Sequence, residues 1–336
     1  MRLLVCIWHP AHVHFFKNVI DRMKKKGHDI VIITYDKEHT ITLLEKLNFK
    51  YLTVGKHSGK NPIKKCLNLF YIQSIIYKII TNNNIDLIVG IAGVYPSFIS
   101  KLLDRKYYSF TDTEHAFISQ KLTVPFSNKI FTPSCFKSNF GKKHIRYNGY
   151  HELAYLHPNN FSPDESVLDS LQMQSGEKYA ILRFVSWEAM HDLGYGSISL
   201  ESKIHLVKSL SKHLKVFISS ECELDKDLEK YKLDIAPEKI HDVLYFSSLY
   251  IGDGATMASE SVVLGTPAIY FNKLTAGTIE EQVQYGLMFR ETNEKLLLKK
   301  SLEIINDIEN WHEKKAKLLN DKIDVTKFIL DAINNT

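Results

Sequence analysis

The stretch that decides the fold runs from Ile251 to Asn272 and reads IGDGATMASESVVLGTPAIYFN. It predicts a buried strand that ends at Gly252, a turn of small residues, a helix over 258–264 and a second buried strand over 268–271. In such a turn the backbone N–H groups and the positive end of the helix dipole converge on one point. That point favours a diphosphate group.

Glu260 lies one helical turn beyond Thr256 and is expected on the same side of the helix. From there its carboxylate can accept hydrogen bonds from both hydroxyls of a ribose. The same pattern is also typical of a tight strand-to-helix crossover in which Glu260 is a solvated helix residue. The pattern alone leaves both interpretations open.

Buried strands and helices also alternate on both sides of this stretch, which predicts parallel sheets with helices on both faces. A segment rich in turn residues, His157 to Pro163, interrupts the series. We therefore predict two Rossmann-like, doubly wound domains, 1–160 and 161–336, that face a central cleft. The expected elements include strands 2–8, 29–34, 86–89, 107–110, 129–132, 179–184, 215–219 and 249–252, and helices 14–26, 38–47, 68–80, 201–212 and 224–231.

Length and composition agree with this division. The 336 residues exceed what one hydrophobic core usually organises, about 250 to 300 residues. The formal charge of +5 is spread among nearly as many carboxylates, which is not typical of a nucleic-acid binder. The four cysteines are far apart and do not have the spacing of a zinc site or a disulfide framework. No apolar run approaches the length of about 18 residues that a transmembrane helix needs. We expect a cytoplasmic protein without a transmembrane span.

In doubly wound sheets, ligands bind outside the carboxyl ends of the strands. In the second domain this edge carries Arg183, followed by a loop that contains His191 and Asp192. The planar guanidinium of Arg183 suits a phosphate, and His191 and Asp192 can reach a sugar. A buried Arg–Asp pair that holds the loop is an equally open interpretation.

In the first domain the strand over 107–110 is followed by Asp112, Glu114 and His115. A sugar hydroxyl loses its proton to a carboxylate or imidazole within hydrogen-bond reach, so Asp112 and Glu114 are candidate catalytic residues. Glu114 is the preferred base, because like-charged neighbours raise basicity. The alternative is that Asp112 or Thr113 caps a helix.

Three histidines, His9, His12 and His14, follow the first strand. A metal site would need all three rings to point at one centre, and no neighbouring carboxylate completes a set, so no metal site is predicted. His14 is retained as a second candidate base, since imidazole titrates near neutral pH. A packed or capping histidine is the alternative for each ring.

The segment Lys60 to Ile80 mixes lysines with large apolar residues. It can dock on an anionic membrane, or it can form a helix packed on the sheet with basic residues at its exposed end. Both interpretations remain open.

The segment over 253–260, followed by Leu264-Gly265-Thr266-Pro267, resembles the donor-nucleotide motif of GT-B enzymes, which include the UDP-N-acetylglucosamine transferase of peptidoglycan synthesis and UDP-N-acetylglucosamine 2-epimerase. The resemblance implies a GT-B fold. It also implies that the amides of Gly254, Ala255 and Thr256 hold the nucleotide phosphates and that Glu260 binds the ribose.

The whole chain is similar to a bacterial and archaeal family of expected glycosyltransferases known as domain of unknown function 354. The landmarks of the resemblance are the segments 10–16, 111–116, 148–152 and 183–187, with His191-Asp192. The resemblance implies the fold but no particular substrate.

Together these observations predict a glycosyltransferase that moves a sugar from a nucleoside diphosphate, of the UDP type, to a glycan or lipid-linked hydroxyl, with the general base on the first domain. No tightly bound cofactor is expected, because the nucleotide sugar is a substrate. A nucleotide-sugar epimerase or hydrolase and a non-catalytic binding protein are the alternatives. The resemblance counts against epimerisation, because the catalytic Asp of the 2-epimerases is replaced by Ile91-Ala92-Gly93.

Overall fold

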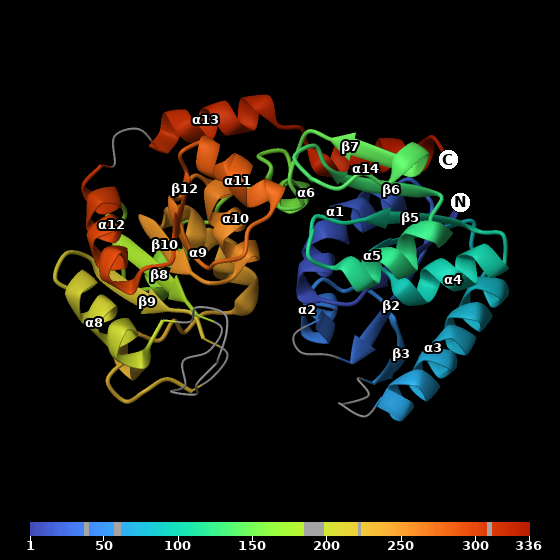
Figure 1. Ribbon diagram of the computed structural model, residues 1–336, viewed down its shortest axis with the longest axis horizontal. Coiled ribbons are helices and arrows are strands. Elements are labelled where there is room, and N and C mark those ends of the chain that lie inside the picture. Colours follow the sequence, from blue (N-terminus) through green and yellow to red (C-terminus); the bar gives the residue numbers. More distant parts are fainter. Residues whose placement is uncertain (37–39, 57–61, 185–197, 221–222, 308–310) are drawn as a thin grey trace. The chain divides into compact units, whose positions relative to one another are not determined.

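The computed structural model describes residues 1–36, 40–56, 62–184, 198–220, 223–307 and 311–336. The chain divides into two compact units. Unit 1 comprises Met1–Tyr155 with Ile323–Thr336, and unit 2 comprises Leu156–Lys322. Each unit contains one parallel β-sheet with helices packed on it, as Figure 1 shows.

Unit 1 is built on a seven-stranded sheet in the order β3-β2-β1-β4-β5-β6-β7, and every neighbouring pair is parallel. The interior strand β1 is apolar and completely buried from Leu3 to Ile7, as a strand covered on both faces must be. The strands are β1 (Arg2–Ile7), β2 (Asp29–Asp36), β3 (Leu52–Lys56), β4 (Leu87–Ile91), β5 (Lys106–Phe110), β6 (Lys129–Pro133) and β7 (His144–Tyr147).

Helices connect these strands in sequence order, and none of the described helices is long and apolar enough to cross a membrane. Helix α1 begins one turn earlier than its apolar spacing predicts, because His9 caps it by accepting a hydrogen bond from the Ala11 amide. The helices of unit 1 are α1 (Pro10–Lys25), α2 (Thr40–Lys46), α3 (Pro62–Asn82), α4 (Val94–Leu102), α5 (Phe117–Thr123), the short η1 (Val124–Phe126) and η2 (Gly141–Lys143), α6 (Leu153–Leu156), which reaches the unit boundary, and the C-terminal α14 (Val325–Asn334).

Helix α14 belongs to unit 1, whereas the sequence analysis placed the whole C-terminal region in the second domain. Its Thr326 hydroxyl donates to the Ala154 carbonyl at 2.5 Å. The Phe328 ring packs against those of Phe131 and Tyr147, with centroids 5.7 and 5.0 Å away. The chain therefore returns to the first sheet after completing the second.

Unit 2 contains a five-stranded parallel sheet in the order β12-β11-β10-β8-β9. Strands β10 and β11 are buried throughout, as their uninterrupted apolar sequences predict. The strands are β8 (Tyr179–Arg183), β9 (Lys215–Ile218), β10 (Leu249–Gly252), β11 (Ala268–Phe271) and β12 (Met288–Glu291).

One helix predicted in this unit, over 224–231, is not formed, and only the short turn η3 (Glu229–Tyr231) is helical there. The Asp225 carboxylate accepts a hydrogen bond from the Asp227 amide at 2.9 Å, so it stabilises a turn that competes with an α-helix. The helices of unit 2 are α7 (Val167–Ser170), α8 (Leu200–Leu210), η3, η4 (Pro237–Lys239), α9 (Ile240–Phe246), α10 (Ala255–Leu264), α11 (Gly277–Gln284), α12 (Glu294–Asn306) and α13 (Trp311–Asp321).

Glycines define the helix α10 at the centre of unit 2. Gly254 is its N-cap, and Gly265, at φ 94°, ends it in a left-handed conformation that favours glycine. Gly252 is required for a different reason, because a Cβ there would overlap the Arg183 carbonyl and the Tyr250 hydroxyl. The close pairing of β8 and β10 therefore depends on Gly252.

Replacing Gly252 by alanine should lower the free energy of unfolding by more than about 2 kcal/mol, because the new methyl group meets a backbone oxygen that cannot move without breaking the sheet. Gly254→Ala is the matched control, since a Cβ there has no atom within 4 Å. Urea unfolding of both variants measures the difference. Equal stability of the two would contradict the close approach at Gly252.

Candidate functional site

In unit 2 the carboxyl ends of β8 and β10 lie side by side, with Gly252 opposite Arg183 in the register. The connection after β8 leads to β9 on one side, whereas β10 and β11 extend the sheet on the other. Strand order therefore reverses between β8 and β10, and open parallel sheets bind ligands at such a reversal. The strand end at Arg183 and the turn after Gly252, both predicted from the sequence to contact a ligand, are brought together at this point.

The turn after β10 leads directly into α10, whose N-terminus opens toward solvent at Ala255 and Thr256. The first N–H groups of an α-helix have no acceptor within the helix, so they are available to an anion. The side-chain amide of Asn272 donates to the Asp253 carbonyl at 3.0 Å and holds the turn in place. The turn is therefore a fixed set of donors beside Arg183.

Two cationic side chains belong to this edge of the sheet. Arg183 donates from Nη1 to the Ser219 hydroxyl at 3.0 Å, which orients the guanidinium across the ends of β8 and β9. Lys203, on α8, is buried with its amine 5.4 Å from the centre of the Phe184 ring. Burial lowers the pKa of Lys203, and Asp253 and Glu294 oppose that shift. Lys203 could not be recognised from the sequence, because it has the spacing of an ordinary helix residue.

Glu260 is buried rather than solvated, and a hydrogen bond of 3.0 Å joins its Oε1 to Nε2 of His241 on α9. A buried carboxylate needs such a partner to offset the loss of hydration. The partner could not be recognised in the sequence, where His241 follows a proline-containing turn with no motif around it. His191 and Asp192, the other residues predicted here, lie outside the described residues.

In unit 1 the structure brings together Asp112, after β5, and His151, after β7. Asp112 Oδ2 lies 3.2 Å from His151 Nδ1, and the Thr113 hydroxyl donates to the other carboxylate oxygen at 3.0 Å. Burial acts to raise the pKa of Asp112, but His151 and these hydrogen bonds lower it to about 2. Asp112 is therefore ionised at neutral pH.

The His151 ring is buried beside Phe15, whose centroid is 4.5 Å away, and parallel to the Tyr147 ring. Its Nε2 atom is buried and has no hydrogen-bond partner among the described residues. Unpaired buried polar atoms are uncommon because they lose hydration without compensation. The sequence analysis included His151 in a family landmark but gave it no role.

Glu114 and His14, the other candidate bases of unit 1, make contacts of their own. The carboxylate of Glu114 is buried and accepts a hydrogen bond of 2.7 Å from the Lys137 amide, which ties the loop after β5 to the loop after β6. His14 packs on Tyr155, with ring centroids 5.3 Å apart. Neither Asp112 nor Thr113 caps α5, whose N-cap is Ala116. The capping interpretation of that motif is therefore excluded.

The histidines after β1 also have distinct roles. His12 accepts a hydrogen bond from the Trp8 amide at 3.3 Å, and His9 caps α1. Burial, with the charges of His9 and His151, lowers the pKa of His12 to about 3 although Asp112 opposes the shift. His12 is therefore neutral at physiological pH. Within the described residues, no three histidine, cysteine, aspartate or glutamate side chains form a group that could hold a metal.

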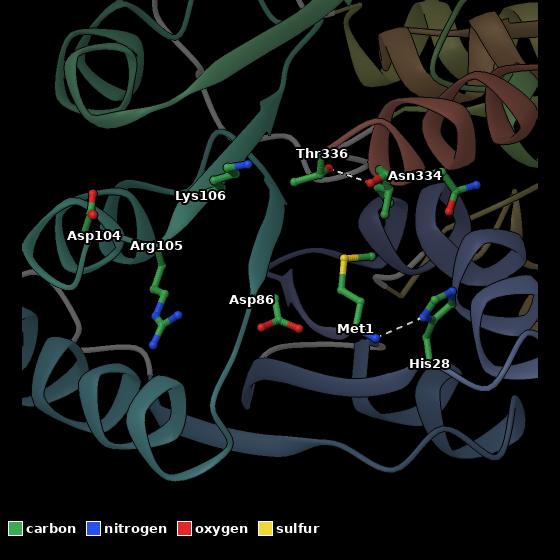
Figure 2. Close-up of a pocket in the computed structure, with 9 residues that line it drawn as sticks. Met1, His28, Asp86, Asp104, Arg105, Lys106, Asn334 and Thr336 are labelled. Carbon is green, nitrogen blue, oxygen red and sulfur yellow. Dashed lines mark hydrogen bonds between the residues drawn. The ribbon is translucent and has the colours of Figure 1, made fainter.

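A cavity of about 530 Å³ opens elsewhere in unit 1, and Figure 2 shows its lining. Asp86 immediately precedes β4, Lys106 begins β5, and His28 immediately precedes β2. The cavity is therefore at the amino ends of the strands, the edge opposite to the one at which these sheets bind ligands. We do not assign it to the candidate site.

Solved structures share this architecture over nearly their full length. The UDP-GlcNAc 2-epimerase of Methanocaldococcus jannaschii superposes with a TM-score of 0.73 at 14% identity, covering 100% of both chains. The same enzyme in complex with UDP-GlcNAc and UDP gives 0.66 at 13% identity, covering 95% of this chain and 98% of that one. A spinosyn rhamnosyltransferase complexed with spinosyn aglycone gives 0.63 at 10% identity, covering 96% of each chain. The fold is thus the two-sheet GT-B fold.

Among proteins of known sequence, an uncharacterized protein of M. jannaschii is 26% identical over 271 residues, which cover 77% of this chain and 78% of that protein. The family model described as "Protein of unknown function (DUF354)" matches residues 2–336. The match spans both units, including the C-terminal helix that returns to unit 1. The chain therefore belongs to the DUF354 family.

Proposed function

We propose that this protein is a glycosyltransferase that moves a sugar from a nucleoside diphosphate, of the UDP type, to a hydroxyl of a surface-glycan or lipid-linked acceptor. The observation that carries the proposal is the pairing of Gly252 with Arg183, which makes Arg183 a neighbour of the turn that leads into α10 at the strand reversal. Nucleotide-sugar enzymes with the same fold, one of them in complex with UDP, support it.

In this proposal the donor diphosphate binds the amides of Gly254, Ala255 and Thr256 and the guanidinium of Arg183. As the bond to the sugar breaks, negative charge grows on the departing diphosphate, and fixed N–H donors and a cation stabilise it. Glu260 accepts hydrogen bonds from the ribose hydroxyls, with His241 holding its carboxylate. His191 and Asp192 are proposed to contact the donor sugar.

The acceptor hydroxyl must lose a proton in the same reaction. We propose His151 as the general base, in addition to Glu114 and His14, which the sequence favoured. The carboxylate of Asp112 fixes the His151 ring through Nδ1, which lies 3.2 Å from Oδ2, and leaves Nε2 as the atom that takes the proton. His12 cannot serve at neutral pH, because a group with a pKa near 3 is a weak base.

Epimerisation is the second candidate, favoured by the higher TM-score with the epimerase of M. jannaschii than with the rhamnosyltransferase, 0.73 against 0.63. Against it stands the loop after β4, where the 2-epimerases carry their catalytic Asp. Here that loop contains Ala92, at φ 44°, and Gly93, whose amide donates to the Tyr107 hydroxyl at 3.0 Å. Neither side chain can transfer a proton at a sugar carbon.

The two reactions differ in products, which provides the direct test. Purified protein is incubated with UDP-sugars and candidate glycan or lipid-linked acceptors. We expect UDP release that depends on the acceptor, with the sugar attached to it. Conversion of UDP-GlcNAc to its 2-epimer without acceptor, followed by nuclear magnetic resonance, would reject transfer in favour of epimerisation. UDP binding in calorimetry without turnover would indicate a binding protein.

Glu260→Gln should weaken UDP binding about tenfold or more, because a neutral amide is a poorer acceptor for the ribose hydroxyls than a carboxylate. Glutamine keeps the shape of the side chain and an oxygen acceptor for His241, so it disturbs the fold less than alanine would. Calorimetry with UDP measures the effect. Glu281→Gln, which breaks a 2.8 Å ion pair with Lys322 in the same unit, is the control. Equal UDP affinity of the two variants would remove Glu260 from the site.

His151→Gln should lower kcat by about a hundredfold or more while UDP affinity stays unchanged, since losing a general base typically costs 10²- to 10⁴-fold. Asp112→Asn should lower kcat less, because the His151 ring loses the carboxylate that fixes its orientation. Parallel assays of Glu114→Gln and His14→Gln decide among the candidates. Wild-type turnover by His151→Gln, with loss in Glu114→Gln, would assign the base to Glu114.

A further inference from the structure

Large hydrophobic side chains are exposed on one group of helices in unit 1. Of the fifteen large hydrophobic residues exposed in the described part of the chain, eight lie on α3, α4 and α5. We call these eight the apolar face: Phe70, Tyr71 and Tyr77 on α3, Phe98 and Leu102 on α4, and Phe117, Ile118 and Leu122 on α5.

The three helices are neighbours, because α4 packs against both α3 and α5, and Figure 1 shows them together on unit 1. Each also has an inward side that is buried, represented by Ile76, Ile99 and Gln120. The residues of the apolar face are therefore not needed to form the hydrophobic core of unit 1. Ile118, with 78% of its surface exposed, is its most accessible residue. Clustered exposed apolar residues typically mark an interaction surface.

Basic residues surround this face. Exposed lysines or arginines stand at Lys78 on α3, Lys101 and Arg105 at the end of α4, and Lys121 on α5. Lys143 donates to the Pro125 carbonyl at 3.0 Å, so it lies beside η1, which packs on α4 and α5. None of the three helices contains an aspartate or glutamate.

The stretch of sequence that contains these helices carries an excess of positive charge. Residues 60–151 contain 13 lysines and arginines but only 4 aspartates and glutamates, so their excess of positive charge is larger than the +5 of the whole chain. The rest of the chain is therefore net negative. Apolar side chains surrounded by basic ones match a bilayer with anionic headgroups, which offers acyl chains and negative charge together.

We propose that the apolar face of α3, α4 and α5 docks the protein peripherally on an anionic lipid bilayer. Ile118, Leu122, Phe98 and Leu102 enter the headgroup–acyl boundary, while Lys101, Lys121 and their neighbours contact lipid phosphates. This extends the docking segment considered from sequence alone, over 60–80, to two further helices. Lipid binding does not depend on sugar transfer, so this inference stands or falls separately from the proposed function.

Vesicle flotation tests the proposal with the full-length protein. Wild-type protein should float with vesicles of equimolar phosphatidylglycerol and phosphatidylcholine, and much less with phosphatidylcholine alone. Each basic residue at an anionic surface contributes roughly fivefold in binding. Lys101→Glu with Lys121→Glu should therefore lower partitioning at least about tenfold, and Ile118→Ser with Leu122→Ser should lower it by a similar factor.

Matched double variants in unit 2 serve as controls. Leu274→Ser with Leu296→Ser removes two other exposed hydrophobic residues, and Lys226→Glu with Lys299→Glu makes the same change in charge. Both should float like the wild type, and thermal unfolding verifies that all variants are folded. Wild-type flotation by the face variants would overturn the proposal. A second outcome would also overturn it: the wild type forms a dimer and binds no lipid, and Ile118→Ser with Leu122→Ser dissociates that dimer. The apolar face would then be an interface between two copies of the chain.

Discussion

Parallel pairing of every strand is the constraint on which the rest of this structure depends. In a parallel sheet all strands end at the same edge, so loops far apart in sequence meet there without any contact designed to join them. The segments after Arg183 and Gly252 become neighbours because β8 and β10 pair, and the loops after β5, β6 and β7 become neighbours in the other sheet. Fixing the register therefore fixes the positions of the candidate residues.

Close pairs of a carboxylate and a buried imidazole recur in the candidate sites of both units. Glu260 with His241 and Asp112 with His151 each join residues that are not neighbours in sequence. Removing a carboxylate from water is costly, and one close partner with good geometry offsets part of that cost. Such pairs hold a charged group in one orientation before a ligand arrives. This preorganisation is what binding a polar ligand requires.

The sequence predicted the elements that depend on local pattern. Uninterrupted apolar runs identified the buried strands, and the small residues around Gly254 identified the turn before α10. The predictions failed where the decisive interaction is distant or competes locally. His241 belongs to no motif, and the landmark that contains His151 gives no sign of its partner. Each histidine acquires a role only from a carboxylate that the fold brings close. The helix expected over 224–231 is replaced by a turn because Asp225 bonds the backbone.

The return of α14 to unit 1 has a consequence for biosynthesis. Ribosomes release the chain from its N-terminus, so the strands of unit 1 emerge long before the helix that completes it. Until α14 arrives, the Phe131 and Tyr147 rings lack the cover of Phe328 during the translation of unit 2. Exposed aromatic surface on a nascent intermediate promotes aggregation. Unit 1 is thus expected to complete its packing only after the whole of unit 2 has been translated.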